Sequence, residues 1–470
     1  MISVVNTTEE AKAVRVRFRE SMNGQEVLQF NLYLGPLDVW TGALTGESEV
    51  LDPVHAPAAT LQTSDRSCTV PQMPAEGQSF INFEYAFNND DGGPYEDSRT
   101  RAGYIEIIEM GRLTGEFAAA VTRTEAGVPA NCQRLVDAWH SGTQGQANGI
   151  WVDHPDEGLL PPSGGVYGGA EIVDVANGTN LSYSAEAIDG FYTLASGSLH
   201  QDLYRKLDLG SARMSDDGTV SAYVFDDGEL IRLDFDPSMS AAPGLKAMSA
   251  VLMREWVYNE FDISSGFATE WVVTFPTRGL HLSYSAQPGV GNDDREPFRY
   301  DYDFWRDNAW SRSRGGLFTW TVTNREAESF ADRQVPTWSG GPPTTGPAPL
   351  ALSSNVLIFG DGCNSRTDVW RGGEPTLVLG AYNSDGIIGP SCVHFAAGTA
   401  QLQFDEDLRG DPITEQQIQD RNGHIIYGLP VLGFSAIKVA LEGGSGSALA
   451  NFSVTHRHHM QTTVDTADGN

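Results

Sequence analysis

Short segments in which apolar and polar residues alternate run through most of the chain. Residues 13–19 (AVRVRFR) are the clearest case, because their apolar side chains share one face and their three arginines the other. A period of two predicts a half-buried antiparallel strand. Residues 27–34 form a second such segment after Asn23-Gly24, a strong turn signal, so we expect the two to pair as a hairpin.

The same pattern recurs later in the chain. Residues 220–225 and 230–235 flank Asp226-Asp227-Gly228, which predicts a second hairpin. Further strands are expected at 270–275, 317–322, 355–359, 376–379, 401–404 and 433–441. Helix signals are few. Asp411-Pro412 begins one predicted helix that ends at Asn422-Gly423, and residues 132–140 form another.

These patterns predict an all-β protein with few short helices, built of two or three antiparallel immunoglobulin-like β-sandwich domains. We expect an N-terminal domain at 1–157, a central domain at 158–340 and a C-terminal domain at 350–470. The proline- and glycine-rich residues 340–349 are either a linker or a long loop. In the second case, the last domain shares one sandwich with the central part.

Charge narrows the range of partners. The 470 residues include 30 basic and 62 acidic side chains, a net charge of −32, and no basic stripe is visible. Such a field repels phosphate backbones, which argues against nucleic-acid binding. The acidic surface either keeps the protein soluble or, in places, holds divalent cations. No segment reaches the ~20 apolar residues of a membrane span.

Four cysteines, Cys68, Cys132, Cys363 and Cys392, form neither a C-x-x-C pair nor a zinc pattern with histidine. We favour the disulfides Cys68–Cys132 and Cys363–Cys392, because each stays within one expected domain. Disulfides imply an oxidising compartment. The alternative is four buried free thiols in a cytoplasmic protein.

The usual catalytic motifs are missing, including the serine nucleophile elbow, H-E-x-x-H and the phosphate-binding glycine loops. The best ligand candidate is an acidic loop between two strand-like segments, 81–87 and 104–108. Its carboxylates belong to Asp90, Asp91, Glu96 and Asp97. Calcium prefers several oxygen ligands from such flexible loops. The alternative is a solvated hairpin loop.

A second candidate is the dense aromatic stretch at 300–310, with Tyr302, Trp305 and Trp310 next to acidic residues. Rings that stack on sugar C–H faces, beside carboxylates that bind hydroxyls, are typical of glycan-binding surfaces. The alternative is that these rings fill a sandwich core.

Several pieces of the chain resemble an uncharacterised family of exported, β-rich proteobacterial cell-surface proteins. The matching segments are 3–8, 13–20, 30–34, 38–41, 259–261, 271–277 and 427–434. The resemblance implies export and an immunoglobulin-like architecture, and it carries no assigned activity. Family members have a leader and one further strand before the equivalent of Ile2. This chain therefore either begins at a processed or truncated start, or takes the missing strand from a neighbouring subunit.

The sequence thus predicts a non-catalytic, secreted or cell-surface structural protein, such as a surface-layer, matrix or filament subunit. Its expected partner is itself, through β-strand addition. The alternative function is a carbohydrate-binding module, calcium-dependent or not, or a glycan-active secreted enzyme. No cofactor other than Ca²⁺ is implied.

Overall fold

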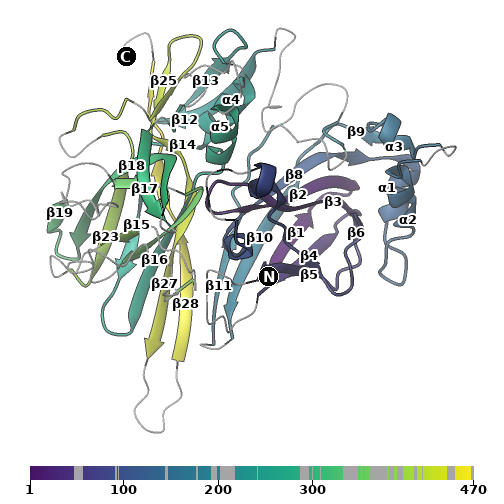
Figure 1. Ribbon diagram of the computed structural model, residues 1–470, viewed down its shortest axis with the longest axis horizontal. Coiled ribbons are helices and arrows are strands. Elements are labelled where there is room, and N and C mark those ends of the chain that lie inside the picture. Colours follow the sequence, from purple (N-terminus) through teal and green to yellow (C-terminus); the bar gives the residue numbers. More distant parts are fainter. Residues whose placement is uncertain are drawn as a thin grey trace.

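In the computed structural model the protein is mostly antiparallel sheet with few, short helices (Figure 1). It describes the chain except for residues 47–56, 90, 92, 94, 143–146, 176–177, 192–197, 202–217, 241, 286–295, 299, 307–308, 332–347, 351, 360–377, 380–385, 389–394, 407–409, 415, 442–449 and 467–470. The expected linker at 340–349 lies largely outside the described residues. No helix in the described part of the chain is long and apolar enough to cross a bilayer.

The N-terminal body consists of two sheets that face each other. The strands of one sheet, in spatial order, are β11 (Thr179–Ser184), β10 (Val166–Asp174), β1 (Ile2–Asn6), β4 (Val39–Thr45), β5 (Thr60–Gln62) and β7 (Gln78–Ser79). Those of the other are β6 (Cys68–Val70), β3 (Glu26–Leu34), β2 (Lys12–Glu20), β8 (Gly103–Leu113) and β9 (Leu159–Leu160). Val4, Val16, Phe30 and Trp40 are fully buried between them. The hairpin predicted at Asn23-Gly24 is confirmed as β2–β3.

Strand β2 corrects one expectation, because it is buried on both faces. Arg15, Arg17 and Arg19 are at most 9% exposed. Glu106 on β8 pairs with Arg17 at 2.8 Å and with Arg19 at 2.9 Å, while Arg15 Nε donates to Asn31 Oδ1 at 2.6 Å. Burial alone would raise the pKa of Glu106, but the two guanidinium groups hold it below its ordinary value. The arginines therefore form a buried ionic layer.

Three helices cover the same sheet beside this layer. They are α1 (Gly115–Val121), α2 (Gln133–Ala138) and α3 (Ile150–Asp153). Helix α2 confirms the prediction at 132–140, and its Leu135 is buried with Tyr33 and Trp151. Three short 3₁₀ turns, η2 (Phe83–Tyr85), η3 (Phe87–Asn89) and η4 (Asp97–Arg101), surround the acidic loop. The strand predicted at 81–87 is therefore wrong.

The C-terminal body again has two facing sheets. One contains β17 (Tyr300–Arg306), β18 (Ala309–Asn324), β23 (Ala397–Gln403), β15 (Trp256–Asp262) and β29 (His459–Gln461), with β19 (Ser329–Ala331) and β20 (Ala348–Leu350) paired to β18. The other contains β22 (Gly386–Ile388), β21 (Ser354–Phe359), β16 (Phe267–Thr274), β27 (Leu432–Leu441) and β28 (Ala450–Arg457). Phe261, Trp271, Trp320 and Phe359 form the centre of its core.

Strand pairing crosses the domain boundaries expected from the sequence. Strands β10 and β11 belong to the N-terminal sheet, so that body extends to Ser184, beyond residue 157. Strand β15 pairs with β23, and β16 with β27. The central and C-terminal segments therefore share one body.

A smaller layer caps one end of the C-terminal body. It contains β12 (Val220–Asp226), β13 (Glu229–Phe235), α4 (Pro243–Leu252), β14 (Met253–Arg254), α5 (Arg278–Ser285), β24 (Gln417–Gln419), β25 (Ile425–Tyr427), β26 (Leu429–Pro430) and β30 (Val464–Asp465). The predicted β12–β13 hairpin is confirmed. The helix predicted at 411–423 is wrong, because β24 occupies part of it. Gln416 bonds to the backbone of Leu317 and Phe404, and Ile418 is buried beneath the hairpin, which keeps this segment extended.

The two bodies are joined along β11 and β28 (Figure 1). Tyr183 stacks on Phe434 with ring centroids 4.6 Å apart. At a second contact, the Arg278 guanidinium donates to the Met22 carbonyl at 2.8 Å, and the backbone of Ser354 bonds to that of Ser21. These contacts tie the bodies together at two separate places.

His200 in the N-terminal body and His458 in the C-terminal body are buried in the neutral form. His200 Nδ1 lies 2.7 Å from the Pro155 carbonyl and must donate to it, so Nε2 accepts from the Tyr33 hydroxyl at 2.9 Å. His458 has the opposite tautomer, because its Nε2 lies 3.1 Å from the Val272 carbonyl. Burial lowers the pKa of both imidazoles to about 4.

These histidines predict a pH dependence of stability. The pKa in the folded state lies below the unfolded value near 6.5, so the unfolded chain binds the proton first as the pH falls. Each histidine therefore contributes stability above pH 6.5 that is lost towards pH 4, on the order of 3 kcal/mol. We expect the free energy of unfolding in urea to differ between wild type and His458→Gln, and this difference to become smaller as the pH falls from 6.5 towards 4. A constant difference would contradict this assignment.

Candidate functional site

The calcium site expected at the acidic loop stays a prediction, because one of its four carboxylates lies outside the described residues. The Asp91 carboxylate is held by Arg99, whose Nη1 lies 2.9 Å from Oδ1, and by the Asn23 amide at 3.0 Å from Oδ2. Asp97 begins the 3₁₀ turn η4 and is exposed, Glu96 precedes that turn, and Asp90 lies outside the described residues. Within the described chain, no three His, Cys, Asp or Glu side chains are grouped to hold a metal.

The role of this loop is to support the hairpin β2–β3. Arg99 reaches past Asp91 to Glu20, with Nε 2.9 Å from Oε2, and both side chains of this second pair are almost fully buried. Glu20 in turn accepts the backbone N–H groups of Met22 and Asn23 at the hairpin turn. Asp91, one of the four carboxylates that suggested a cation site, therefore binds a guanidinium group.

The aromatic stretch lies on two paired strands. Tyr302 and Trp305 belong to β17, and Trp305 lies opposite Trp310 of β18 in the register. The structure describes the backbone of these residues and not their side chains. A glycan site formed by the three rings stays a prediction.

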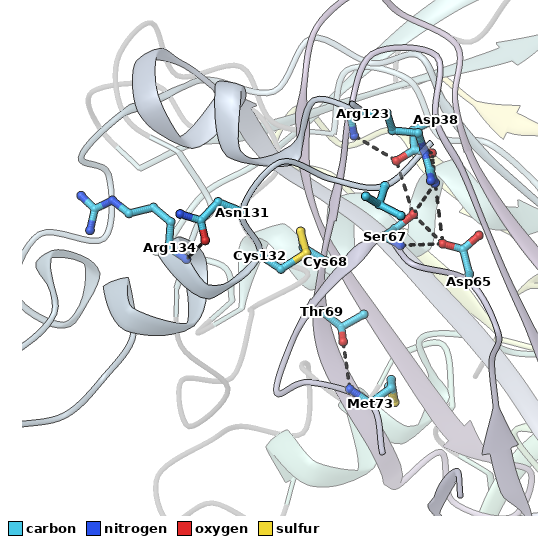
Figure 2. The surroundings of a disulfide bond; sticks show 12 residues. Asp38, Asp65, Ser67, Cys68, Thr69, Met73, Arg123, Asn131, Cys132 and Arg134 are labelled. Atoms are coloured by element: carbon cyan, nitrogen blue, oxygen red, sulfur yellow. Dashed lines mark hydrogen bonds and ion pairs between the residues drawn. A yellow bond between two sulfur atoms is a disulfide. The ribbon is translucent and has the colours of Figure 1, made fainter. Parts of the chain in front are cut away.

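A disulfide joins Cys68 to Cys132, the pairing favoured from the sequence, with a Cα–Cα distance of 5.2 Å (Figure 2). Cys68 begins β6 and Cys132 precedes α2, so the bond fixes the helices to the sheet. Next to it, Arg123 donates to Asp38 at 2.7 Å and to Ser67 at 3.1 Å (Figure 2). Cys363 and Cys392 lie outside the described residues.

Among the described residues, the fold brings together a serine–histidine pair that the sequence does not reveal. Ser249 on α4 lies 2.8 Å from Nε2 of His281 on α5 and donates to Thr277 at 2.9 Å. Serine nucleophiles use such a pair, but here all three side chains are at most 1% exposed. No substrate carbonyl can reach the hydroxyl, so the pair serves to join the two helices.

The first strand is internal to its sheet, and the sheet edge at β11 is occupied. Strand β1 pairs with β10 on one side and β4 on the other, so the first strand needs no donated neighbour. Strand β11 ends its sheet, but its Asn180 and Ser182 carbonyls accept the hydroxyls of Ser453 and Thr455 on β28. These bonds occupy backbone acceptors that an incoming strand would use.

Strand β28 presents an open edge of a five-stranded sheet. It is eight residues long, ends its sheet and pairs along its whole length with β27 only. The face that does not contact β11 carries Phe452 at 53% and Val454 at 39% exposure, followed by exposed His456. A long edge strand with exposed apolar side chains is a template for strand pairing. The alternation at 452–456 was the available sequence signal.

A polar groove of about 340 Å³ opens beside β28, near the point where the chain passes from β28 to β29. It is lined by Tyr258, Asn259, Glu260, Thr399, Thr455, His456, Arg457 and His459, and the Arg457 guanidinium is paired with Glu186. They come from four strands, and the chain crosses between the sheets at buried His458. Phenol, hydroxyl, imidazole and carboxylate groups can donate and accept hydrogen bonds here. The groove and the β28 edge together form the candidate functional site.

The ionic cluster beneath the acidic loop predicts a large loss of stability in Arg99→Met. This change leaves Glu20 buried without its cation, which costs about 3–5 kcal/mol in such pairs. We expect urea unfolding to show that loss, and Glu20→Gln in the same chain to restore part of it. Arg134→Met, which breaks the exposed pair with Glu116, is the control and should change the melting temperature little. If Arg99→Met and Arg134→Met lowered the free energy of unfolding by the same amount, this interpretation of the loop would be refuted.

The disulfide predicts a second loss of stability. Its two cysteines are 64 residues apart, and closing a loop of that size stabilises by ~4 kcal/mol in the chain-entropy model. We expect Cys68→Ala with Cys132→Ala to lower the free energy of unfolding by about this amount, measured in urea without reductant. An unchanged unfolding midpoint would show that this bond does not constrain the chain.

No protein-family model matches this chain, and neither a curated protein nor a solved structure matches it. The assignment of function therefore rests on the geometry and chemistry described above.

Proposed function

We propose that this chain is a non-catalytic structural protein of the cell surface or extracellular matrix, and that copies of it associate by strand addition at β28. The observation that carries the proposal is the exposed β28 edge, with Phe452 and Val454 on its open face. An added strand would extend the sheet β22–β21–β16–β27–β28 by one and cover both apolar side chains.

The distribution of edges supports this choice of surface. Strand β1 is internal, and the edge strand β11 has backbone acceptors bonded to side chains. The hairpin strands β12 and β13 also have open edges, but they form a sheet of their own, whereas β28 ends a five-stranded sheet. This arrangement argues against the idea that a neighbour supplies the first strand. It favours β28 as the place where a copy would add.

The remaining features are consistent with an extracellular location. The Cys68–Cys132 disulfide is typical of an oxidising compartment, and the net charge of −32 keeps separate copies soluble. Two facing antiparallel sheets in each body are consistent with immunoglobulin-like sandwiches, the architecture that we propose for them. The one serine–histidine pair described above is inaccessible, in line with a non-catalytic role.

Light scattering over a wide range of protein concentration tests the proposal. We expect the mean mass of the wild type to rise with concentration, because the β28 edges meet more often. Phe452→Lys with Val454→Lys should keep the chain monomeric, since charges on an edge strand oppose pairing. Tyr223→Lys with Phe225→Lys, on the exposed face of β12, is the matched control and should behave as wild type. A wild type that stays monomeric at every concentration would rule out self-assembly at β28.

A further inference from the structure

The outer face of the sheet β18–β23–β15–β29 carries a regular array of hydroxyl, amide and aromatic side chains. Alternate residues such as Val257, Trp320 and Leu402 point into the core, so their neighbours along each strand point outwards. These outward positions are partly or fully exposed. The face therefore presents a set of side chains to solvent that the hydrophobic core does not use.

The register arranges these side chains in three rows across the strands. The first row is Thr319, Gln403, Trp256 and Gln461. The second row is Thr321, Gln401, Tyr258 and His459. The third row is Thr323, Thr399 and Glu260. We call these three rows the threonine–glutamine face.

Charge is nearly absent from this face. Glu260 is its one carboxylate, and none of its other positions is lysine or arginine, although the chain as a whole carries −32. A polyanion would be repelled by that overall charge, and a cationic partner would find far more carboxylates elsewhere on the chain. Long aliphatic side chains are also missing from the three rows, so the face does not fit an apolar partner. Its chemistry is complementary to an uncharged partner rich in hydroxyl groups.

Several of these side chains are held in place by neighbours. Gln401 Nε2 donates to Gln403 Oε1 at 2.9 Å, and Gln403 Nε2 donates to Asp405 at 2.7 Å, which orients the two amides along β23. Trp256 and Tyr258 lie edge to face with ring centroids 6.5 Å apart. Fixed amides and rings lose little conformational entropy when a ligand binds.

The face continues into the polar groove. Tyr258, Glu260, Thr399 and His459 belong to both, and His456 of β28 forms the far wall of the groove. A ligand that lies across the rows can therefore extend one end into a cavity. The other sheet of this body contacts the N-terminal body, because its strand β28 lies against β11 of that body. Strands β23 and β19 lie on the side away from the N-terminal body (Figure 1). The contact between the bodies leaves the threonine–glutamine face uncovered.

We propose that the threonine–glutamine face and its groove bind a neutral polysaccharide. Trp256 and Tyr258 offer ring surface to the C–H groups of the sugars, while threonine hydroxyls and glutamine amides exchange hydrogen bonds with sugar hydroxyls. The three rows lie on the other sheet from Phe452 and Val454, and neither of these residues lines the groove, so binding does not require self-assembly. The site also differs from the aromatic stretch around Trp305.

Affinity electrophoresis tests this site. The probes are gels that contain a soluble neutral polysaccharide, namely mixed-linkage β-glucan, arabinoxylan, galactomannan or dextran, with polygalacturonate as the anionic comparison. We expect at least one neutral polymer to retard the wild type, and Tyr258→Ala to weaken that binding at least tenfold. Thr321→Ala, a smaller change on the same row, should weaken it measurably in a chain that melts at the wild-type temperature. Tyr223→Ala, on the separate β12–β13 hairpin, should bind as wild type.

The monomeric variant Phe452→Lys with Val454→Lys separates this proposal from self-assembly. We expect it to bind the same polymer with unchanged affinity per chain, because neither residue belongs to the three rows. Three results would overturn the proposal: no retardation by any neutral polymer, retardation by polygalacturonate alone, or retardation that Tyr258→Ala and Thr321→Ala leave unchanged.

Discussion

The buried ion pairs between Glu106 and the arginines of β2 are the constraint on which the N-terminal body depends. A guanidinium group without a partner cannot be buried at acceptable cost, so β2 and β8 must keep the register that brings Arg17 and Arg19 to one carboxylate. A shift by one residue would turn these charges into the apolar core. The ion pairs thus select one register, and apolar packing on the other face stabilises it.

Buried arginine side chains also hold the place where the N-terminal body meets the C-terminal body. Arg99 holds Glu20 and Asp91 at the β2–β3 turn, and Arg278 binds the backbone of that turn from the other side. The turn is therefore a polar joint between the bodies. Apolar contacts such as Tyr183 with Phe434 act at the second joint, along β11 and β28.

The sequence predicted features that depend on neighbours along the chain. The turns at Asn23-Gly24 and Asp227-Gly228 have short-range signals, and Gly24 and Gly228 do adopt positive φ.

Features that depend on distant partners were missed. Burial of the β2 arginines requires Glu106, nearly ninety positions away, and Asp91 was assigned to calcium because nothing local shows that Arg99 points at it. The helix predicted at 411–423 had a good cap, but contacts of Gln416 with Leu317 and Phe404 decided its conformation. The groove was out of reach, since its residues come from β15, β23, β28 and β29.

The hydroxyl bonds from Ser453 and Thr455 to the carbonyls of β11 have a mechanical consequence. Strand β28 is hydrogen-bonded to β27 along its length and is fastened crosswise to the other body. Tension applied to β28 is therefore shared between two folded units and acts on many bonds in shear at once. In the proposed assembly, a subunit with this connection would resist being peeled apart strand by strand when neighbouring copies pull on it.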